Sequence, residues 1–493
     1  MFRCSPLLRR LSLPALHVRP RILAHRIDFL PPCRVSIRPL LACFACLTVF
    51  PVNTFADAEP PSSFTLLVSS GNAEARRAVE RGMSHLLTSW DEAAYITFSR
   101  AHELDPSCVL ASWGILLSTL GSDHHTERAG ALATLQNATR YQNLLPQEQA
   151  YCEALALLLG EGSASAAACI RHCSERFRRD LTLKLWEIVF LRNGYDLAGN
   201  PRREQERALV LCEEVLRETP NAHAALFLRA LLEETAPRIS PRAIECARRA
   251  VSLAPGHPVS RLLLGHLLAR ADMWSEAVPL FQQAADLYES GCREIGCGPD
   301  NDDGQIRALL ALATAQWKQG NQRASLDTRR KLKKLTINKE RLNSRRSRLL
   351  IWEVRTLPAR ITLSEEKHPD AGDIKACMQA AVLTGMPNDD PARDYLNCLR
   401  HVMEARLALS CGDKWKASVY LDQAQRALDA LLAPPPPGSG ERDAAYVARA
   451  IEASRIAVYR TRSMLTPSTA EFWKQDADET ARPSSSLLPP VMP

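Results

Sequence analysis

Apolar and small residues recur along most of this chain with the spacing of one face of an α-helix. Ala94, Phe98 and Ala101 stand at positions i, i+4 and i+7, which return to the same side of a 3.6-residue helix, and Pro106 follows at i+12. Windows rich in Ala, Leu, Arg and Glu dominate, whereas alternating runs of Val, Ile and Thr are nearly absent. The pattern predicts an all-α protein.

The same spacing returns at a nearly constant interval: Ala208, Ala243 and Ala277 follow one another in steps of 35 and 34 residues. Alanine at the outer positions lets a neighbouring helix approach closely, and proline at i+12 ends the helix because it has no backbone N–H to donate. A glycine twelve residues before the first alanine marks a second, closely packed helix. The residues of this repeat-packing signature are Gly82, Ala94, Phe98, Ala101, Pro106, Ala208, Pro220, Ala243, Ala250, Pro255, Gly265, Ala277, Phe281 and Ala284.

This signature resembles the tetratricopeptide repeat, an antiparallel helix pair of about 34 residues. Residues 94–106 are the most faithful copy, and Asp91-Glu92-Ala93 and Ser112-Trp113-Gly114 are similar to a bacterial multi-repeat subgroup of unassigned role. The resemblance implies a right-handed α-solenoid of antiparallel helix pairs. It also implies a non-enzymatic scaffold or assembly factor that holds a protein or peptide partner in a concave groove. The first helices that would line this groove lie near 76–88, 109–120, 224–235 and 258–270.

Composition and repeat phase divide the chain into segments. Two hairpins are expected at 74–145, and helical repeats with three tetratricopeptide-like units at 146–290. The other expected segments are a leader at 1–58, a lead-in at 59–73, a loop rich in Cys, Gly and Asp at 291–305, degenerate helical repeats at 306–432, a Pro/Gly linker at 433–440, a helix at 441–463 and a disordered tail at 464–493.

The leader has the parts of a secretory signal peptide. It holds eight arginines and no lysine, and an apolar run from Leu40 to Val52 precedes Ala56-Asp57-Ala58. We therefore expect a disordered leader, cleavage near Ala58 and export to the periplasm or the cell exterior. Three alternatives stay open: a true start near Val35, an Arg-rich organelle presequence, and a lipoprotein box ending at Cys43.

The net charge changes once the leader is set aside. The whole chain carries +7, and removing the leader's eight arginines and two aspartates leaves 54 basic and 53 acidic residues, or +1. The basicity therefore belongs mainly to a targeting segment, and we expect no nucleic acid partner.

Two groups of residues have part of a metal site. Asp123, His124 and His125 are expected in a turn, and Cys169 and Cys173 share a helix face. Structural zinc takes four ligands, often as two pairs, and neither group has a second pair nearby. We predict a solvated turn and core-like thiols, with no metal or cofactor. A metal-dependent enzyme on a helical array remains an alternative.

Cys292 and Cys297 stand in the segment predicted as a Gly-rich loop. Export would allow a disulfide between them, because oxidising compartments preserve such bonds. Against this bond, the chain after the leader has eleven cysteines, an odd number.

The segment 329–348 is strongly basic, with Lys333, Lys334, Arg345 and Arg346 among its cations. It is a candidate for weak contact with a membrane surface or another polyanion, although a solvated helix face explains it as well. It lacks the interleaved aromatic residues that stack on single-stranded bases. We find no phosphate-binding glycine loop, His-Glu-x-x-His or Gly-x-Ser-x-Gly motif, and we predict no catalytic residue.

Overall fold

The computed structural model describes the residues numbered 66–120, 124–141, 144–196, 199–294, 303–335, 353–358, 391–432 and 441–466, with single positions at 360, 361, 363, 372, 374, 375, 471 and 472. Within these ranges every regular element is a helix, apart from one antiparallel bridge between Tyr195 and Pro201. The all-α prediction is confirmed. No helix in the described ranges has both the length and the apolar character that crossing a bilayer requires.

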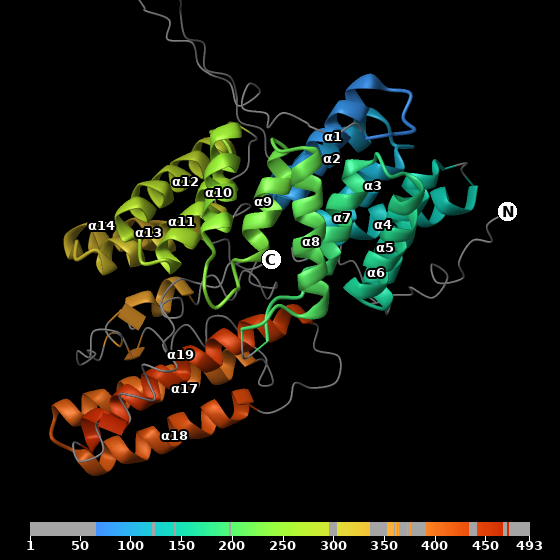
Figure 1. Ribbon diagram of the computed structural model, residues 1–493. Helices are drawn as coiled ribbons and strands as arrows, with labels where there is room; N and C mark the ends of the chain where they lie inside the picture. The colour runs from blue at the N-terminus through green and yellow to red at the C-terminus, as the bar shows by residue number, and fades with distance from the viewer. Residues whose placement is uncertain are drawn as a thin grey trace, which may run out of the picture.

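The helices from α1 to α14 form successive antiparallel pairs, each packed on the next (Figure 1). The predicted solenoid of helix pairs is therefore confirmed. The pairs are α1 (Ala73–Leu87) with α2 (Asp91–Leu104), α3 (Val109–Ser118) with α4 (His125–Tyr141), α5 (Pro146–Gly160) with α6 (Ser163–Arg176), α7 (Leu181–Leu191) with α8 (Arg203–Glu218), α9 (His223–Leu232) with α10 (Pro241–Leu253), α11 (Pro258–Arg270) with α12 (Trp274–Glu294), and α13 (Gly304–Lys318) with α14 (Gln322–Lys334).

Local signals fix where several helices begin. The Asn72 side chain accepts hydrogen bonds from the backbone N–H groups of Glu74 and Ala75, at 2.9 and 3.2 Å, and so caps α1. Proline stands first in α5, α10 and α11, where its missing N–H costs nothing. The buried carboxylate of Glu148 in α5 accepts from Ser69 N–H at 2.9 Å, which ties the lead-in to the third hairpin.

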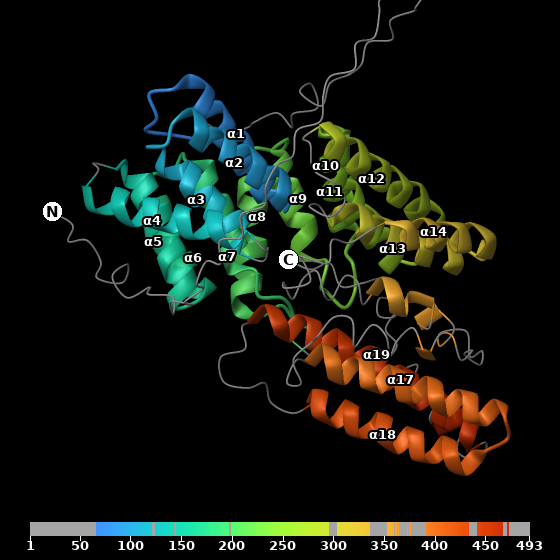
Figure 2. The same ribbon diagram turned by 180° about the vertical axis from the view of Figure 1, so that it is seen from behind.

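Three further helices form a separate bundle: α17 (Pro391–Ser410), α18 (Lys414–Leu432) and α19 (Glu441–Leu465) (Figure 2). Met403 and Val458 belong to its own apolar core, distinct from the core that runs through the hairpins. The fully buried Arg406 crosses this bundle and donates from Nε to Thr461 Oγ1 at 3.0 Å. In the described residues, the protein thus has two cores.

Glycine allows the closest helix contacts. A Cβ placed on Gly82 of α1 would lie 2.8 Å from the Phe98 ring of α2, and one on Gly114 of α3 would collide with the same ring. Gly265 and Phe281 repeat this arrangement between α11 and α12, where the added Cβ would lie 2.6 Å from the ring. Each ring thus fills the space that glycine leaves open.

Candidate functional site

The first helices of the later pairs, which form the inner wall, are buried on most sides. All ten residues of α9 are buried, and so are the residues of α13 from Gly304 to Ala315. The second helices instead bury one face: α10 buries only Ala243, Cys246, Ala247 and Ala250. The inner wall is therefore packed against other parts of the same chain.

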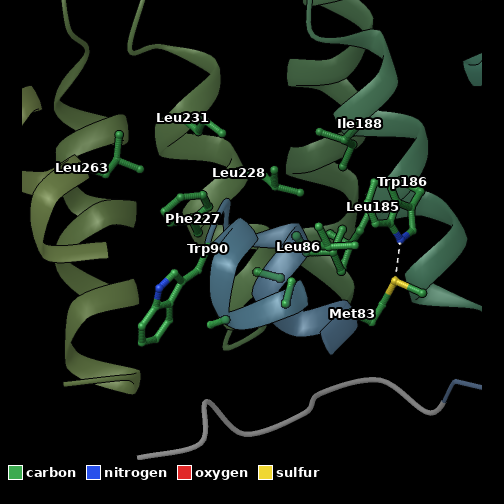
Figure 3. Close-up of a cluster of buried hydrophobic side chains, with 14 of the residues drawn as sticks. Met83, Leu86, Trp90, Leu185, Trp186, Ile188, Phe227, Leu228, Leu231 and Leu263 are labelled. Atoms are coloured by element: carbon green, nitrogen blue, oxygen red, sulfur yellow. Dashed lines mark hydrogen bonds between the residues drawn. The ribbon is translucent and has the colours of Figure 1, made fainter. Parts of the chain in front are cut away.

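Aromatic rings from several hairpins meet at the centre of the wall. The Trp113 ring of α3 contacts Trp186 of α7 edge-on at a centroid distance of 5.0 Å, and Tyr151 of α5 at 5.4 Å. Trp186 Nε1 donates to Met83 Sδ of α1 at 3.0 Å, shown as the dashed line in Figure 3. Four hairpins thus share one aromatic centre.

Residues 83–90, here called the hairpin tip, extend this contact to the fifth and sixth pairs. Trp90 meets His257, the cap of α11, edge-on at 5.4 Å, and Tyr288 of α12 at 6.2 Å. Thr88 Oγ1 lies 3.1 Å from His257 Nε2. Figure 3 shows the tip between the walls formed by α7, α9 and α11. The first hairpin therefore docks inside the curve of its own solenoid.

This docking corrects one expectation from the sequence. The helices expected near 76–88, 109–120, 224–235 and 258–270 exist, but their inner faces meet one another instead of lining an open groove. The physical reason is side-chain size, since the wall carries Trp, Tyr, Phe, Met and Leu, which bury large apolar areas when they meet.

A small cavity of about 30 Å³ lies beside the hairpin tip, between α1, α7 and α9. Its lining is apolar except at Ser89 and Arg192; the lining residues are Leu86, Leu87, Ser89, Ile188, Val189, Arg192, Leu228, Leu231 and Leu232. We call it the tip cavity, and it is the candidate site.

Three histidines lie next to one another beside the hairpin tip. His223, at the start of α9, and His257 are each 2% exposed, and His85 of α1 lies at the edge of the group. Burial lowers the pKa of His223 to about 4 and that of His85 to about 4. Burial, helped by the nearby His223 and His85, holds the pKa of His257 well below its ordinary value. All three are neutral at pH 7.

Charged networks brace the wall from the outer side. Glu187 of α7, 3% exposed at its side chain, pairs with Arg171 and Arg207 at 3.1 Å each, joining α6, α7 and α8. Glu213 and Glu233 likewise hold Arg229, at 2.7 and 2.6 Å. Each of these carboxylates is already paired with an arginine, so we assign these groups a structural role.

The signature residues lie at helix contacts in the apolar core. Gly82 and Gly265 are buried in first helices, and the second-helix members Ala94, Phe98, Ala101, Ala208, Ala243, Ala250, Ala277, Phe281 and Ala284 are each at most 1% exposed. Pro106, Pro220 and Pro255 lie in the turns after their helices.

The residues considered for a metal do not converge. His124 stacks on Tyr95 at 4.1 Å, while Asp123 and the His125 side chain fall outside the described residues. Cys169 and Cys173 are free thiols whose sulfurs approach the backbone carbonyls of Ala150 and Pro146, at 3.8 and 3.9 Å. Among the residues described, no group of three or more metal-ligating side chains comes together.

The structure describes only part of the predicted Cys/Gly/Asp loop and of the basic segment. Cys292 lies in the last turn of α12 and not in a loop, because that helix runs to Glu294, and Cys297 lies outside the described residues. In the basic segment, Arg330 pairs with Asp327 at 2.8 Å and Lys331 with Glu289 at 3.5 Å, while the numbers 336–348 lie outside the description. The leader at 1–58 also falls outside it.

The hairpin tip and the histidines were missed by sequence reasoning. His257 stands before Pro258 and an apolar run, which is a readable sign of a helix cap. Its contact with Thr88 spans 169 residues, and no local pattern encodes such a contact.

No family model and no curated protein matches the chain. Solved structures similar to it include the APC/C hetero-tetramer Cut9–Hcn1 (12% identity, 82% of this chain and 76% of that chain, TM-score 0.39) and yeast Tom70 (12%, 83% and 88%, 0.39). The human IFIT1 dimer with PPP-AAAA is another (16% identity, 74% and 92%, TM-score 0.31). At TM-scores this low, the fold is assigned from the chain's own helix order and glycine–phenylalanine packing. On those grounds the chain folds as a solenoid of tetratricopeptide-type helical hairpins.

Proposed function

We propose that this protein is a non-enzymatic scaffold that binds another protein through the inner wall at the tip cavity. The observation that carries this proposal is the docking of the hairpin tip itself. The wall formed by α7, α9 and α11 receives Met83 and Leu86 from one turn of an amphipathic helix, as well as Trp90 (Figure 3). A wall that accepts one helix end is suited to another, because helix-in-groove binding uses apolar anchors at this spacing.

The partner we propose is an amphipathic segment of another protein, seated beside the tip. Leu228 and Leu231 of α9 and Ile188 of α7 line the tip cavity and give the partner an apolar floor. The partner is not a nucleic acid in this proposal, since the chain after the leader carries a net charge of only +1.

Site-specific photocrosslinking in the native host tests this binding. A photoreactive residue is placed at Ser89 or Arg192, both in the lining of the tip cavity, and in a matched control at Val210, which is 56% exposed on α8. We expect one reproducible protein adduct from the two cavity positions and none from Val210. No adduct at either cavity position, or the same adducts at all three, would contradict the proposal.

We further propose that the protein acts outside the cytoplasm, in the periplasm or beyond. The support is the order of a basic stretch, an apolar run and Ala56-Asp57-Ala58. N-terminal sequencing of the protein from its host tests this. A first residue shortly after Ala58 is expected; a first residue upstream of Leu40 would exclude cleavage of a signal peptide at that point.

A further inference from the structure

The hairpin tip is held by a hydrogen-bonded chain that ends on two buried histidines. Thr88 Oγ1 donates to the Ser84 carbonyl at 2.8 Å and lies 3.1 Å from His257 Nε2. Ser260 Oγ lies between the two imidazoles, 2.9 Å from His257 Nδ1 and 3.1 Å from His223 Nε2. The chain joins α1, α9 and α11 through side chains that water does not reach.

The protonation state of His257 is fixed by its role as the cap of α11. Its Nδ1 accepts a hydrogen bond from the Ser260 backbone N–H at 3.2 Å. A neutral imidazole has one acceptor and one donor nitrogen, so Nε2 carries the proton and donates to Thr88 Oγ1. A second proton would have to sit on Nδ1, where it would displace the hydrogen bond from the Ser260 N–H and leave only Ser260 Oγ, at 2.9 Å, as an acceptor. Protonation therefore removes the cap of α11.

His223 offers no better place for a positive charge. Its ring lies 5.3 Å from the His257 ring, and its buried Nδ1 has no hydrogen-bond partner among the described residues. The titratable side chains around the pair are His85 of α1, which has Arg81 beside it, and Tyr288 of α12 behind Trp90. None of these is a carboxylate that could neutralise an imidazolium.

We infer that His223 and His257 form a pH-dependent latch, whose protonation releases the hairpin tip from the inner wall and exposes that wall to a partner. This inference rests on the proposed function for the identity of what binds, but the release itself is a property of this chain alone. The released wall would present Leu228, Leu231 and Ile188 as a wider apolar surface than the tip cavity offers.

The direction of the pH effect follows from the lowered pKa values. Burial lowers the pKa of His223 from 6.5 to about 4 in the docked state, whereas a released, hydrated imidazole returns to about 6.5. The docked state therefore binds fewer protons, so its stability is full above pH 6.5 and is lost as the pH falls toward 4. Between pH 7.5 and 5.0 an opening that hydrates His223 should become about 30-fold more favourable from this residue, and further from His257.

Hydrogen exchange measured on the full chain tests the latch without any partner. We expect the amide protection of residues 83–90 and 257–263, corrected for intrinsic exchange rates, to fall at least 30-fold between pH 7.5 and 5.0. Residues 414–432 of α18 serve as an internal control, because they contain no histidine and belong to the separate core. Equal protection of the tip at both pH values would overturn the inference.

A double variant separates titration from general destabilisation. His257→Asn keeps a side-chain oxygen that can cap α11 and His223→Gln keeps an amide near Ser260, yet neither residue titrates. We expect the pH-dependent fall in tip protection to shrink to less than about threefold. If the double variant does not fold, the single variant His257→Asn replaces it, and its pH-dependent decrease in tip protection should be smaller than that of the wild type. A decrease as large as in the wild type, in whichever variant folds, would refute the latch.

The two proposals fail in different ways. Photocrosslinking from Ser89 and Arg192 at pH 7.5 and 5.0 reports on the partner, and hydrogen exchange reports on the latch. Equal adducts at both pH values with an unchanged tip leave the scaffold standing and remove the latch. A tip that opens at pH 5.0 while no adduct forms at either pH leaves the latch standing and removes the scaffold.

Discussion

At the residue scale, the fold depends on pairs in which a glycine faces a large ring. Phe98 is fully buried and occupies the space above Gly82 and Gly114, so two helices can approach it from opposite sides. The ring and the glycines must match in size, because close-packed interiors tolerate neither a void nor an extra methyl group. A small residue therefore has a specific partner here.

Gly82→Ala tests this match. The added methyl would stand 2.8 Å from a rigid ring, so we expect a loss of about 1–3 kcal/mol in the free energy of unfolding, reduced by up to about 1 kcal/mol from alanine's better helix propensity. Gly130→Ala in α4 is the matched control, because a Cβ there meets nothing within 4 Å. Urea denaturation should show the control equal to or more stable than the wild type, and a stabilised Gly82→Ala would contradict the packing described.

The thiols give a second residue-scale prediction. Burial raises the pKa of Cys108 to about 11 and that of Cys398 to about 12, whereas Cys411 is exposed in the turn between α17 and α18. Since the thiolate is the reacting form, alkylation of the native protein at pH 8 should label Cys411 at least tenfold faster than the two buried thiols. Peptide mapping by mass spectrometry measures these rates. Comparable rates in the native protein, with the same reagent, would show that the cores open readily.

At the element scale, several helix boundaries and the apolar face of each second helix have a local cause, and this is why the sequence predicts the solenoid. The i, i+4, i+7 spacing placed α2, α10 and α12 on the right faces, since a helical period is a local property. The fate of the inner wall was not predictable in the same way. Trp186 and Met83 are 103 residues apart, and whether they meet depends on the summed curvature of four hairpins.

The cap of α1 provides an element-scale prediction. Asn72→Ala removes the oxygen that accepts from Glu74 and Ala75, and also the bond from Nδ2 to the Leu104 carbonyl at 3.2 Å. We expect about 1 kcal/mol less stability, with the loss concentrated in the first hairpin. Hydrogen exchange should show weaker protection in α1 and α2. Asn72→Asp, which keeps the cap, is the control and should retain most of the protection of the wild type.

At the scale of the whole molecule, the described residues contain two separate cores. Met83 is fully buried in the core of the hairpins and Met403 in that of the three-helix bundle. Substitutions at distant sites without shared partners have additive effects on stability. A destabilising substitution in one core should therefore leave the other core unaffected.

Met403→Ala tests this separation. Losing the buried side chain should cost about 2–5 kcal/mol and lower amide protection in α17, α18 and α19. The comparison is Met83→Ala, which should weaken α1 and α7 and leave the bundle unchanged. Loss of protection in both regions from either substitution would show that the protein unfolds as one unit.

The contact between Thr88 and His257, which are 169 residues apart, has a consequence for the protein's synthesis. Most solenoids fold as they emerge from the ribosome, because each repeat needs only its neighbours. Here the first hairpin waits for the sixth, which at about 5–20 residues per second means roughly ten to thirty seconds. During that interval Met83 and Trp90 are without their final neighbours. The first hairpin therefore completes its packing only after the sixth pair has been made.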